Sequence, residues 1–378
     1  MTNFHALANA PAQPLRRQWL LQAAAGAALA SGLPLAALAL PARVLQFPCD
    51  FGSHPLLRTE WWYVTGQARA GGQRWGFQVT FFRSRVPSTQ GLRSAFAAHQ
   101  LLFAHAALTD LQGGRSYHDQ RIARAGFGVA QASEADTAIH INDWSLVRRD
   151  QGTGSRYTAQ VQAADFALAL QCDTTQPLLL QGQGGLSQKG PQAAQASYYY
   201  SQPQMRVSGH LQRGGERFDV QATSHPGDNR AWLDHEASDA LLHPQAVGWD
   251  WIGMNLLDGS ALTAFRLRRA DGSALWAGGS FRALGQAARI FDATGVVFTP
   301  ERYWVSPLGG TRYPVQWRVS TPAGSFQVRA LLDNQELDSR GSTGAVYWEG
   351  LCDLLDGAGQ RVGSGYLEMT GYAQALRL

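Results

Sequence analysis

Hydrophobic and polar residues alternate with a period of two through long stretches of the chain after residue 45, while helical periodicity is weak. This alternation is typical of β-strands that bury one face of a sheet. Residue pairs that favour tight turns interrupt it, namely Gly71-Gly72, Gly113-Gly114, Gly214-Gly215, Asp258-Gly259, Asp271-Gly272 and Asp356-Gly357. Short strands joined by such turns predict an all-β protein whose sheets close into barrels or pack as sandwiches.

The length of 378 residues suggests two domains. A turn-rich stretch at residues 224–230 separates two long β-rich halves. We therefore predict an N-terminal domain at residues 44–225 and a C-terminal domain at residues 226–378. Each half contains a hairpin that begins with tryptophans and ends in an aromatic residue followed by arginine, which suggests an internal duplication.

The register of the first hairpin follows from a two-residue turn at Gly71-Gly72, which sets Glu60 opposite Arg83. One face of this hairpin is then plain core. The other face carries aromatic rings with scattered hydroxyl and amide groups, namely Trp61, Tyr63, Thr65, Gln78, Thr80 and Phe82. Such a face suits a ligand cavity, and a partly solvated sheet face fits the same pattern. Trp61, Tyr63 and Phe82 are therefore candidate substrate-binding residues.

The second hairpin contains the motif Trp249-Asp250-Trp251. A two-residue turn at Asp258-Gly259 predicts that Trp251 faces Arg266, so that the guanidinium lies over the indole. Trp249, Trp251 and Arg266 join the candidate substrate-binding residues on this basis.

A dense polar cluster runs from Trp232 to Asp239. On a strand, Trp232, Asp234 and Glu236 share one face and His235 takes the other. Two enclosed carboxylates beside an indole repel each other, which raises the pKa of one of them and prepares it to donate a proton near neutral pH. Asp234 is the candidate acid, with Glu236 and His235 completing the candidate catalytic set and Trp232 beside the substrate. A structural network, in which the carboxylates pair with arginines or backbone N–H groups, fits the same residues.

A smaller cluster comprises His54, Arg58 and Glu60, with Arg83 opposite Glu60 in the predicted register. These residues are predicted to lie at a barrel mouth or to tie the barrel together. We predict no metal and no cofactor. His99 and His105 on one strand would lie ~20 Å apart, and no nucleotide-binding or nucleophile–base motif is present.

Composition narrows the class of protein. A 45% hydrophobic content excludes a disordered chain, and no run of 18 apolar residues follows residue 45, which excludes a multi-span membrane protein. The net charge of +4 comes without basic clusters, so no nucleic-acid partner is expected. The abundance of aromatic residues, including 12 Trp, favours thick sheet cores or a pocket for a flat or oily ligand.

The N-terminal residues 1–39 resemble an export signal. Arg16-Arg17 precede a mild apolar run, which is the twin-arginine pattern, and Ala37-Leu38-Ala39 fits a cleavage site. We expect cleavage near Ala39, a periplasmic or secreted mature protein and no stable membrane anchor, with an ordinary Sec signal as the open alternative. In an oxidising compartment one disulfide could form among three cysteines, and the sequence does not select the pair.

Several motifs together resemble those of the carotenoid 1,2-hydratase (CrtC) and AttH-like family, in order and over nearly all of the mature chain. The motifs are residues 59–66, residues 75–83, residues 231–236, residues 248–251, Ser306-Pro307 and residues 365–372. The resemblance implies two lipocalin-like antiparallel barrels side by side and a lipophilic ligand. In the hydratase branch, water adds across an isolated alkene, and the proposed acid falls in the Asp-His segment, which matches Asp234 and His235 here.

The chain departs from the hydratases by the extra carboxylates Glu236 and Asp239, and by Tyr198–Gln202, where a His and a Trp are expected. The match is therefore to the secreted AttH-like branch. Two functions stay open for a protein that handles an isoprenoid or lipid-like molecule. The first is an enzyme, a hydro-lyase, isomerase or cyclase with Asp234 as proton donor, and a hydrolase is less favoured because a nucleophile–base pair is lacking. The second is a non-catalytic periplasmic binding protein accessory to an ABC transporter.

Overall fold

The computed structural model describes residues 40–225, 227–240 and 242–376. Regular structure in this part is almost all antiparallel strand, and its helices are two short 3₁₀ turns, η1 (Cys49–Phe51) and η2 (Pro87–Thr89). No helix among the described residues is long and apolar enough to cross a membrane. The prediction of an all-β protein is confirmed. The predicted export signal, residues 1–39, lies outside the described residues.

The first sheet has 14 strands and forms a nearly closed barrel. Its strands follow the order β4 (Arg115–Arg124), β3 (Gln100–Asp110), β2 (Gln73–Arg85), β1 (Thr59–Ala70), β14 (Arg230–Ser238), β12 (Ala196–Arg213), β9 (Phe166–Asp173), β8 (Gly154–Gln162), β7 (Trp144–Gln151), β6 (Ala138–Ile141) and β5 (Ala130–Ala132). Three short strands pair with β12: β10 (Leu179–Leu180), β11 (Leu186–Gln188) and β13 (Glu216–Asp219).

The second sheet has 10 strands and comes from the C-terminal part of the chain. Its order is β18 (Arg289–Phe291), β17 (Ala274–Arg282), β16 (Ala261–Arg268), β15 (Gly248–Leu256), β24 (Arg361–Met369), β23 (Ala345–Leu355), β21 (Gly324–Ala330), β20 (Arg312–Thr321) and β19 (Val297–Val305), with β22 (Glu336–Ser339) paired to β23. Together the two sheets form the predicted pair of lipocalin-like barrels.

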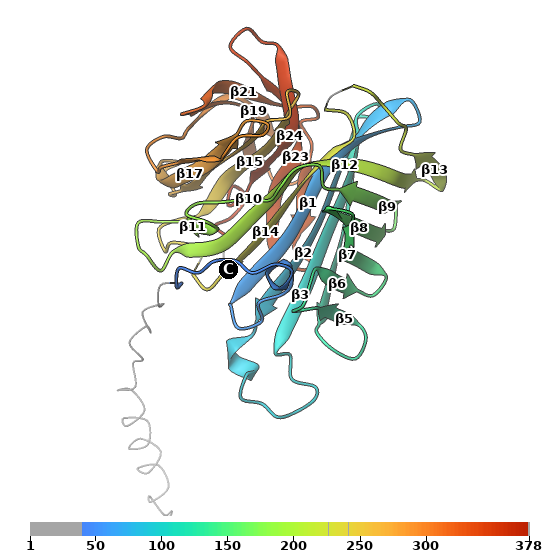
Figure 1. Ribbon diagram of the computed structural model, residues 1–378, viewed down its shortest axis with the longest axis vertical. Helices are drawn as coiled ribbons and strands as arrows, with labels where there is room; N and C mark the ends of the chain where they lie inside the picture. Colours follow the sequence, from blue (N-terminus) through green and yellow to red (C-terminus); the bar gives the residue numbers. More distant parts are fainter. Residues whose placement is uncertain (1–39, 226, 241, 377–378) are drawn as a thin grey trace, which may run out of the picture. The chain divides into compact units, whose positions relative to one another are not determined.

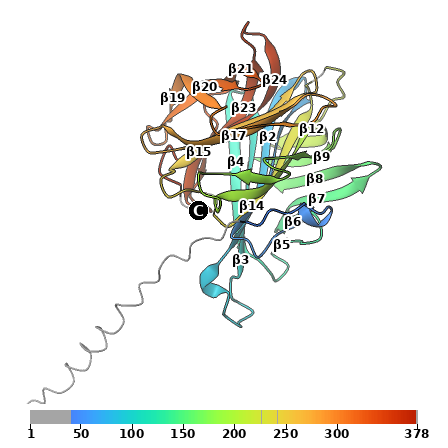
Figure 2. The same ribbon diagram turned by 60° about the vertical axis from the view of Figure 1, so that its left-hand side comes forward.

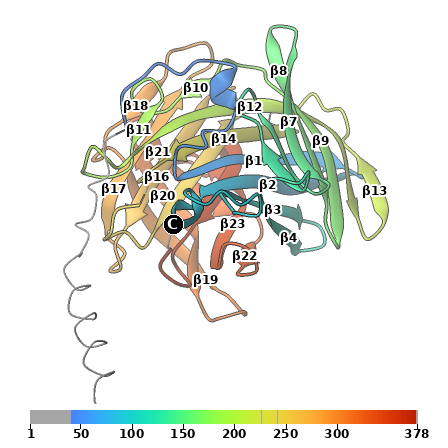
Figure 3. The same cartoon turned by 90° about the horizontal axis from the view of Figure 1, so that it is seen from below.

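Each sheet encloses its own hydrophobic core, and a third apolar cluster, which includes Tyr63, Trp232 and Trp251, lies where the sheets meet. Figure 1 shows the orange and red strands of the second sheet beside the blue and green strands of the first. The same grouping persists after a turn about the vertical axis (Figure 2). Seen from below, β1 and β14 run between the second sheet and the strands β7 to β9 (Figure 3). From the first sheet, strands β1, β2, β12 and β14 contact the second sheet.

The chain passes from the first sheet to the second between β14 and β15, after the boundary predicted at residues 225/226. β14 pairs with β1 on one edge and β12 on the other, so the segment with the carboxylate cluster belongs to the first sheet. Residues 39–378 form one compact unit. The division of this unit into domains at residues 44–225 and 226–378 stays a prediction.

The first hairpin has the predicted register. Glu60 pairs with Arg83 and Trp62 with Phe81, around a turn in which Gly71 and Gly72 both have positive φ. Positive φ at both central residues is what a type I′ turn requires, and glycine adopts it without steric cost. One face of the hairpin packs into the first core, and the other faces the second sheet.

The predicted register of the second hairpin is wrong by one residue. Trp251 lies opposite Phe265, and Arg266 lies opposite Asp250. The turn contains three residues instead of two, because Leu256 N–H bonds to the carbonyl of Ser260 at 2.9 Å and the Asp258 side chain accepts the Ser260 N–H at 2.8 Å. Because of the extra residue, Arg266 does not lie over the Trp251 indole and instead forms an ion pair with Asp250 at 2.7 Å.

The three cysteines are free thiols. Cys49 is exposed, and Cys172 and Cys352 are buried in the first and second cores. The disulfide that the composition allowed is therefore not formed in this structure.

Candidate functional site

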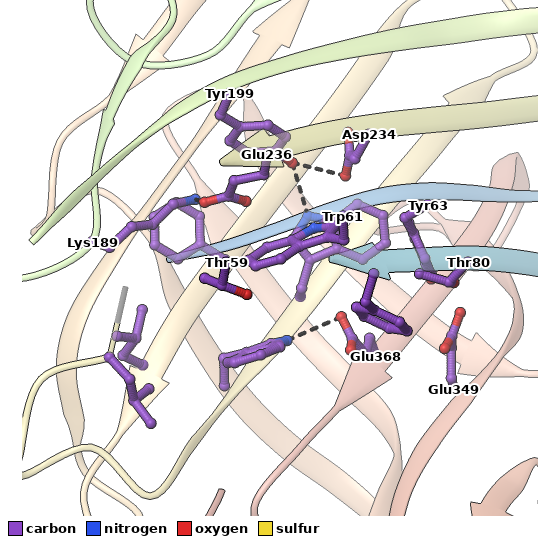
Figure 4. A pocket seen from close by; sticks show the side chains of 16 residues that line it. Thr59, Trp61, Tyr63, Thr80, Lys189, Tyr199, Asp234, Glu236, Glu349 and Glu368 are labelled. Atoms are coloured by element: carbon purple, nitrogen blue, oxygen red, sulfur yellow. Dashed lines mark hydrogen bonds and ion pairs between the residues drawn. The ribbon is translucent and has the colours of Figure 1, made fainter. Parts of the chain in front are cut away.

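A pocket lies between the two sheets, and both contribute to its walls (Figure 4). Its volume is about 110 Å³. A cavity of about 150 Å³ accommodates benzene, so this pocket encloses a fragment near the size of one isoprene unit, and the rest of a longer isoprenoid would lie outside it. Its lining residues are Thr59, Trp61, Tyr63, Thr80, Phe82, Lys189, Tyr199, Asp234, Glu236, Leu242, Trp249, Trp251, Phe265, Leu267, Glu349 and Glu368.

The walls are largely aromatic. Trp61 on β1 and Trp249 on β15 stack with ring centroids 6.5 Å apart and an interplanar angle of 13°. Tyr63 meets Trp251 edge to face at 5.3 Å. The two hairpins thus contribute facing rings from different sheets, and the electron-rich ring faces can attract positive charge.

Asp234 on β14 lies in the pocket wall and is 3% exposed. Its carboxylate accepts hydrogen bonds from Ser201 Oγ at 2.5 Å, Trp232 Nε1 at 2.7 Å and Tyr199 Oη at 2.8 Å. Burial raises the pKa of Asp234 to about 7, and the nearby Glu236 adds to the rise, while the three donors oppose it. The carboxyl can therefore hold or release a proton near neutral pH.

Glu236 has a different electrostatic environment, because a cation accompanies it. Lys189 Nζ lies 3.0 Å from Glu236 Oε1, and Ser197 donates a hydrogen bond to the same carboxylate. The ammonium of Lys189 also lies over the rings of Tyr199 and Phe265, at 4.4 and 4.3 Å from their centroids. The cation of this segment is thus a lysine and not one of the expected arginines, while the expected backbone contact is present at Asp239, whose Oδ1 accepts the Arg58 N–H at 2.8 Å.

Two further carboxyls line the pocket from the second sheet, and the sequence analysis missed both. Glu349 on β23 and Glu368 on β24 are direct cross-strand partners, and Glu349 is buried while Glu368 is half-buried. Burial raises the pKa of Glu368 to about 7 although Trp249 Nε1 donates to its Oε2 at 3.0 Å. Burial and the Glu368 charge raise the pKa of Glu349. Their sequence signal was an acidic residue between apolar neighbours in each of two strands, which is unusual without a partner.

His235 points away from the pocket, to the opposite face of β14. Its ring stacks on Trp62 with centroids 4.5 Å apart, and its Nε2 lies 2.9 Å from Glu60 Oε1. Burial lowers the pKa of His235, so it is neutral at pH 7. The neutral ring then donates from Nε2 to Glu60 and accepts from the Tyr200 hydroxyl at Nδ1, 3.1 Å away.

Glu60, Arg83 and His235 are buried and form one cluster with the partly exposed His54, which we call the Glu60 cluster. Glu60 accepts from Arg83 Nε at 2.8 Å and lies 2.6 Å from His54 Nδ1. One side-chain atom from each of His54, Glu60 and His235 lies within 4.8 Å of the others, as in a metal site. The two histidine atoms already bind the carboxylate, and the Arg83 charge opposes a cation, so the geometry favours a structural role.

The remaining candidates lie outside the pocket. Arg266 pairs with Asp250 and its guanidinium lies 5.0 Å from the Trp317 ring centroid. Arg58 contacts Asp239 through its backbone N–H at 2.8 Å. Trp232 supports the site indirectly, since its indole donates to Asp234. The structure thus brings together Trp61, Tyr63, Phe82, Asp234, Glu236, Trp249 and Trp251, and separates them from His235, Arg266 and the Glu60 cluster.

The fold and this pocket define a two-barrel lipocalin-like protein with a buried polar site, and the chain belongs to the AttH-like family, whose profile matches residues 38–372. A Nitrosomonas europaea protein described as AttH is 45% identical and has a TM-score of 0.80, over 88% of this chain and 99% of that one. The family resemblance found in the sequence is confirmed.

More distant structures share the fold. Kievitone hydratase from Nectria haematococca has a TM-score of 0.65 at 13% identity, covering 88% of this chain and 94% of its own. CghA has a TM-score of 0.51 at 14% identity, covering 85% and 90%. No curated protein sequence matches the chain significantly.

Proposed function

We propose that the protein binds a lipophilic, isoprenoid or lipid-like molecule in the pocket between its sheets and that Asp234 protonates an alkene of this ligand. The observation that carries the proposal is one buried carboxyl, Asp234, in an aromatic wall with a pKa of about 7. An acid with this pKa is partly protonated at neutral pH and still acidic enough to donate, which is the compromise that general acid catalysis needs.

The proposed reaction balances without an added reagent. The Asp234 proton forms a C–H bond as the π bond breaks, and the neighbouring carbon becomes a cation. The faces of Trp61, Trp249 and Trp251 lie in the same pocket and can stabilise that charge. In hydration, a water oxygen bonds to the cationic carbon and its proton returns to the Asp234 carboxylate. In isomerisation, the carbon next to the cationic centre instead loses its proton to the Asp234 carboxylate, and the electrons of that C–H bond form the new π bond.

The distant neighbour kievitone hydratase supports hydration as a reaction that this fold can host, because its name describes a hydratase. At 13% sequence identity, the similarity shows a shared fold only. The proposal of hydration by this chain therefore rests on Asp234 and its pocket. The competing proposal is a binding protein that carries the same ligand to an ABC transporter. It needs the aromatic walls and makes no use of the proton on Asp234.

The first test is to identify the ligand. Native mass spectrometry of protein purified from its own cells, followed by organic extraction, is expected to release an isoprenoid or lipid-like molecule. A substrate and product that differ by one water support hydration. A single molecule released unchanged supports the carrier proposal, and a polar, non-lipid ligand would contradict both.

The second test follows the atoms. Ligand-free protein is mixed with the extracted molecule in H₂¹⁸O and, separately, in D₂O. Hydration places one ¹⁸O on carbon in the first experiment and one deuterium on carbon in the second. Asp234→Asn is expected to lose both labels while binding the ligand, and Asp219→Asn, the same change at an exposed site, is expected to keep them. Equal labelling by Asp234→Asn would rule out Asp234 as the acid.

We also propose that the protein is exported through its twin-arginine segment, on the strength of Arg16-Arg17 and the apolar run that follows. Replacing both arginines by lysine is expected to leave the protein in the cytoplasm, as cell fractionation would show. Unchanged export of this variant would indicate the Sec route instead.

A further inference from the structure

The pocket contains four carboxyls and a single cation among its lining residues. Lys189 is that cation, and it pairs with Glu236. Asp234 has three neutral donors around it. Glu349 and Glu368 have no positively charged side chain beside them in the lining. This end of the pocket, formed by Glu349, Glu368 and Tyr63, is called the acidic end below.

Two polar atoms of the acidic end lack a hydrogen-bond partner within the described part of the chain. They are Glu349 Oε1 and the hydroxyl of Tyr63. Both residues are more than nine-tenths buried, and both line the pocket. The Tyr63 hydroxyl and the Glu349 carboxyl lie close enough to influence each other's protonation, yet neither atom makes a well-formed hydrogen bond, so together they offer a polar group at the cavity wall that a ligand can complete. In Figure 4 the Glu349 and Glu368 side chains lie on the same side of the pocket, near Tyr63.

The strand register places Glu349 opposite Glu368, which destabilises the sheet when no ligand is bound. Glu349 and Glu368 are direct partners on β23 and β24, and like-charged residues directly opposite each other destabilise a sheet. Trp249 donates one hydrogen bond to Glu368, and because this neutral donor is the pair's one such contact in the lining, burial and mutual repulsion raise the pKa of both carboxyls and keep protons on the pair. A bound cation would relieve both the repulsion and the desolvation.

The other end of the same pocket shows how an ammonium is bound there. Lys189 Nζ lies 3.0 Å from a Glu236 oxygen and over two aromatic rings, at 4.3 and 4.4 Å from their centroids. The acidic end has the same ingredients without the ammonium: the carboxyls of Glu349 and Glu368, and the rings of Trp249, Phe82 and Tyr63. Carboxylates combined with aromatic faces are typical recognition elements for protonated amines and quaternary ammonium groups.

We propose that the acidic end binds a protonated amine or quaternary ammonium group carried by the lipophilic ligand. The proposal rests on the proposed function in that it uses the same pocket, and it specifies the chemical class of the ligand. The ammonium lies between Glu349, Glu368 and the Trp249 ring, while the apolar part extends along the aromatic walls toward Asp234. A neutral alcohol of the same carbon skeleton lacks the charge and gains only a hydrogen bond.

The test compares geranylamine with geraniol, two isoprenoids that share a carbon skeleton and differ in the charge of one end. Their affinities for ligand-free protein at pH 7 are measured by isothermal titration calorimetry. We expect geranylamine to bind at least about tenfold more tightly than geraniol. In the double variant Glu349→Gln and Glu368→Gln, we expect the two affinities to agree within about twofold, and Asp219→Asn should retain the full preference.

The outcomes separate this proposal from the proposed function. Retained geraniol binding shows that the pocket of the double variant is intact, so its loss of amine preference supports the acidic end as the ammonium site. Geraniol binding as tightly as geranylamine to the unmodified protein overturns the ammonium proposal and leaves the proposed function standing. Persistence of the preference in the double variant places the ammonium elsewhere and also overturns it. Failure of both isoprenoids to bind contradicts the pocket itself, and with it both proposals.

Discussion

The hydroxyl of Tyr199 donates a hydrogen bond to Asp234 Oδ2 at 2.8 Å and is itself 3.3 Å from Trp251 Nε1, which donates to it. The candidate acid of the first sheet is thus connected to an aromatic wall of the second sheet through one tyrosine. This connection makes the protonation of Asp234 depend on the packing of the two sheets.

Replacing Tyr199 by Phe should shift the pH profile of activity. The Tyr199 hydrogen bond favours ionised Asp234, so its loss raises the pKa of Asp234 further. A tenfold change in this protonation equilibrium corresponds to about 1.4 kcal/mol. Because the acid must be protonated to act, activity should persist to higher pH, while the maximal rate falls about tenfold as the acid weakens. Tyr198→Phe is the matched control, since the Tyr198 hydroxyl bonds to the Pro41 carbonyl outside the pocket. An unchanged profile in Tyr199→Phe would exclude Tyr199 as a positioning residue.

The stability of the protein should also report the protonation of Asp234. Its pKa rises from 3.8 to about 7 on folding, so the folded state binds the additional proton and is favoured at low pH. This contribution is fully present below pH 3.8 and is lost as the pH rises through about 7. Between pH 5 and pH 7 the free energy of unfolding of the unmodified protein should fall by about 2 kcal/mol relative to Asp234→Asn. Denaturant unfolding at several pH values measures the difference, and parallel curves for the two proteins would contradict it.

The Glu60 cluster is expected to contribute to the stability of the folded protein and not to the chemistry of the pocket. Burial opposes ionisation of Glu60, but hydrogen bonds from His235 and His54 and the charge of Arg83 outweigh it and lower its pKa. Its contribution is therefore present above pH 4.5 and is lost as the pH falls. Glu60→Gln leaves Arg83 buried without its partner and should cost about 3 kcal/mol. Asp219→Asn removes an exposed ion pair with Arg217 and should cost less than about 1 kcal/mol. Equal costs for the two variants would show that the cluster is not a structural centre.

Gly253 allows the Trp251 ring to lie over the strand. A Cβ added at Gly253 would lie 2.4 Å from the Trp251 side chain and 3.1 Å from that of Trp232, so Gly253→Ala must displace the Trp251 ring. The displaced ring should lose its hydrogen bond to Tyr199 and narrow the pocket. We expect geraniol affinity to fall about tenfold with little change in the secondary structure seen by circular dichroism. Gly91→Ala is a control in open space at a residue without positive φ, and its added carbon should leave the affinity unchanged. Unchanged affinity in Gly253→Ala would mean that Trp251 is not a wall of the ligand site.

Local rules predicted the parts of the fold that local chemistry determines. The Gly71-Gly72 turn gave the register of the first hairpin, and with it the face that carries Trp61, Tyr63 and Phe82 into the pocket. The alternation along β14 separated Asp234 and Glu236 from His235 correctly. The predicted register of the second hairpin was wrong because the Asp258 side chain stabilises a three-residue turn. The sequence pair Asp258-Gly259 does not by itself distinguish this turn from a two-residue turn.

The acidic end could not be assembled from the sequence, because its parts meet only through tertiary structure. Glu349 and Glu368 lie on different strands of the second sheet, while Tyr63 belongs to the first. Lys189, the single lysine of the chain, reaches the pocket from a loop after β11. No spacing along the chain connects these residues, and their approach depends on how the two sheets pack.

The most direct test of the central claim is the titration of the Asp234 carboxyl itself. Protein labelled with ¹³C at aspartate side-chain carboxyls gives one signal per aspartate, and the signal absent from Asp234→Asn belongs to Asp234. The account predicts a titration midpoint near pH 7, and a shift of this signal when geraniol occupies the pocket. A midpoint near the ordinary aspartate value of about 4, or a signal that does not respond to a bound isoprenoid, would contradict the claim that Asp234 is a protonated acid facing a ligand.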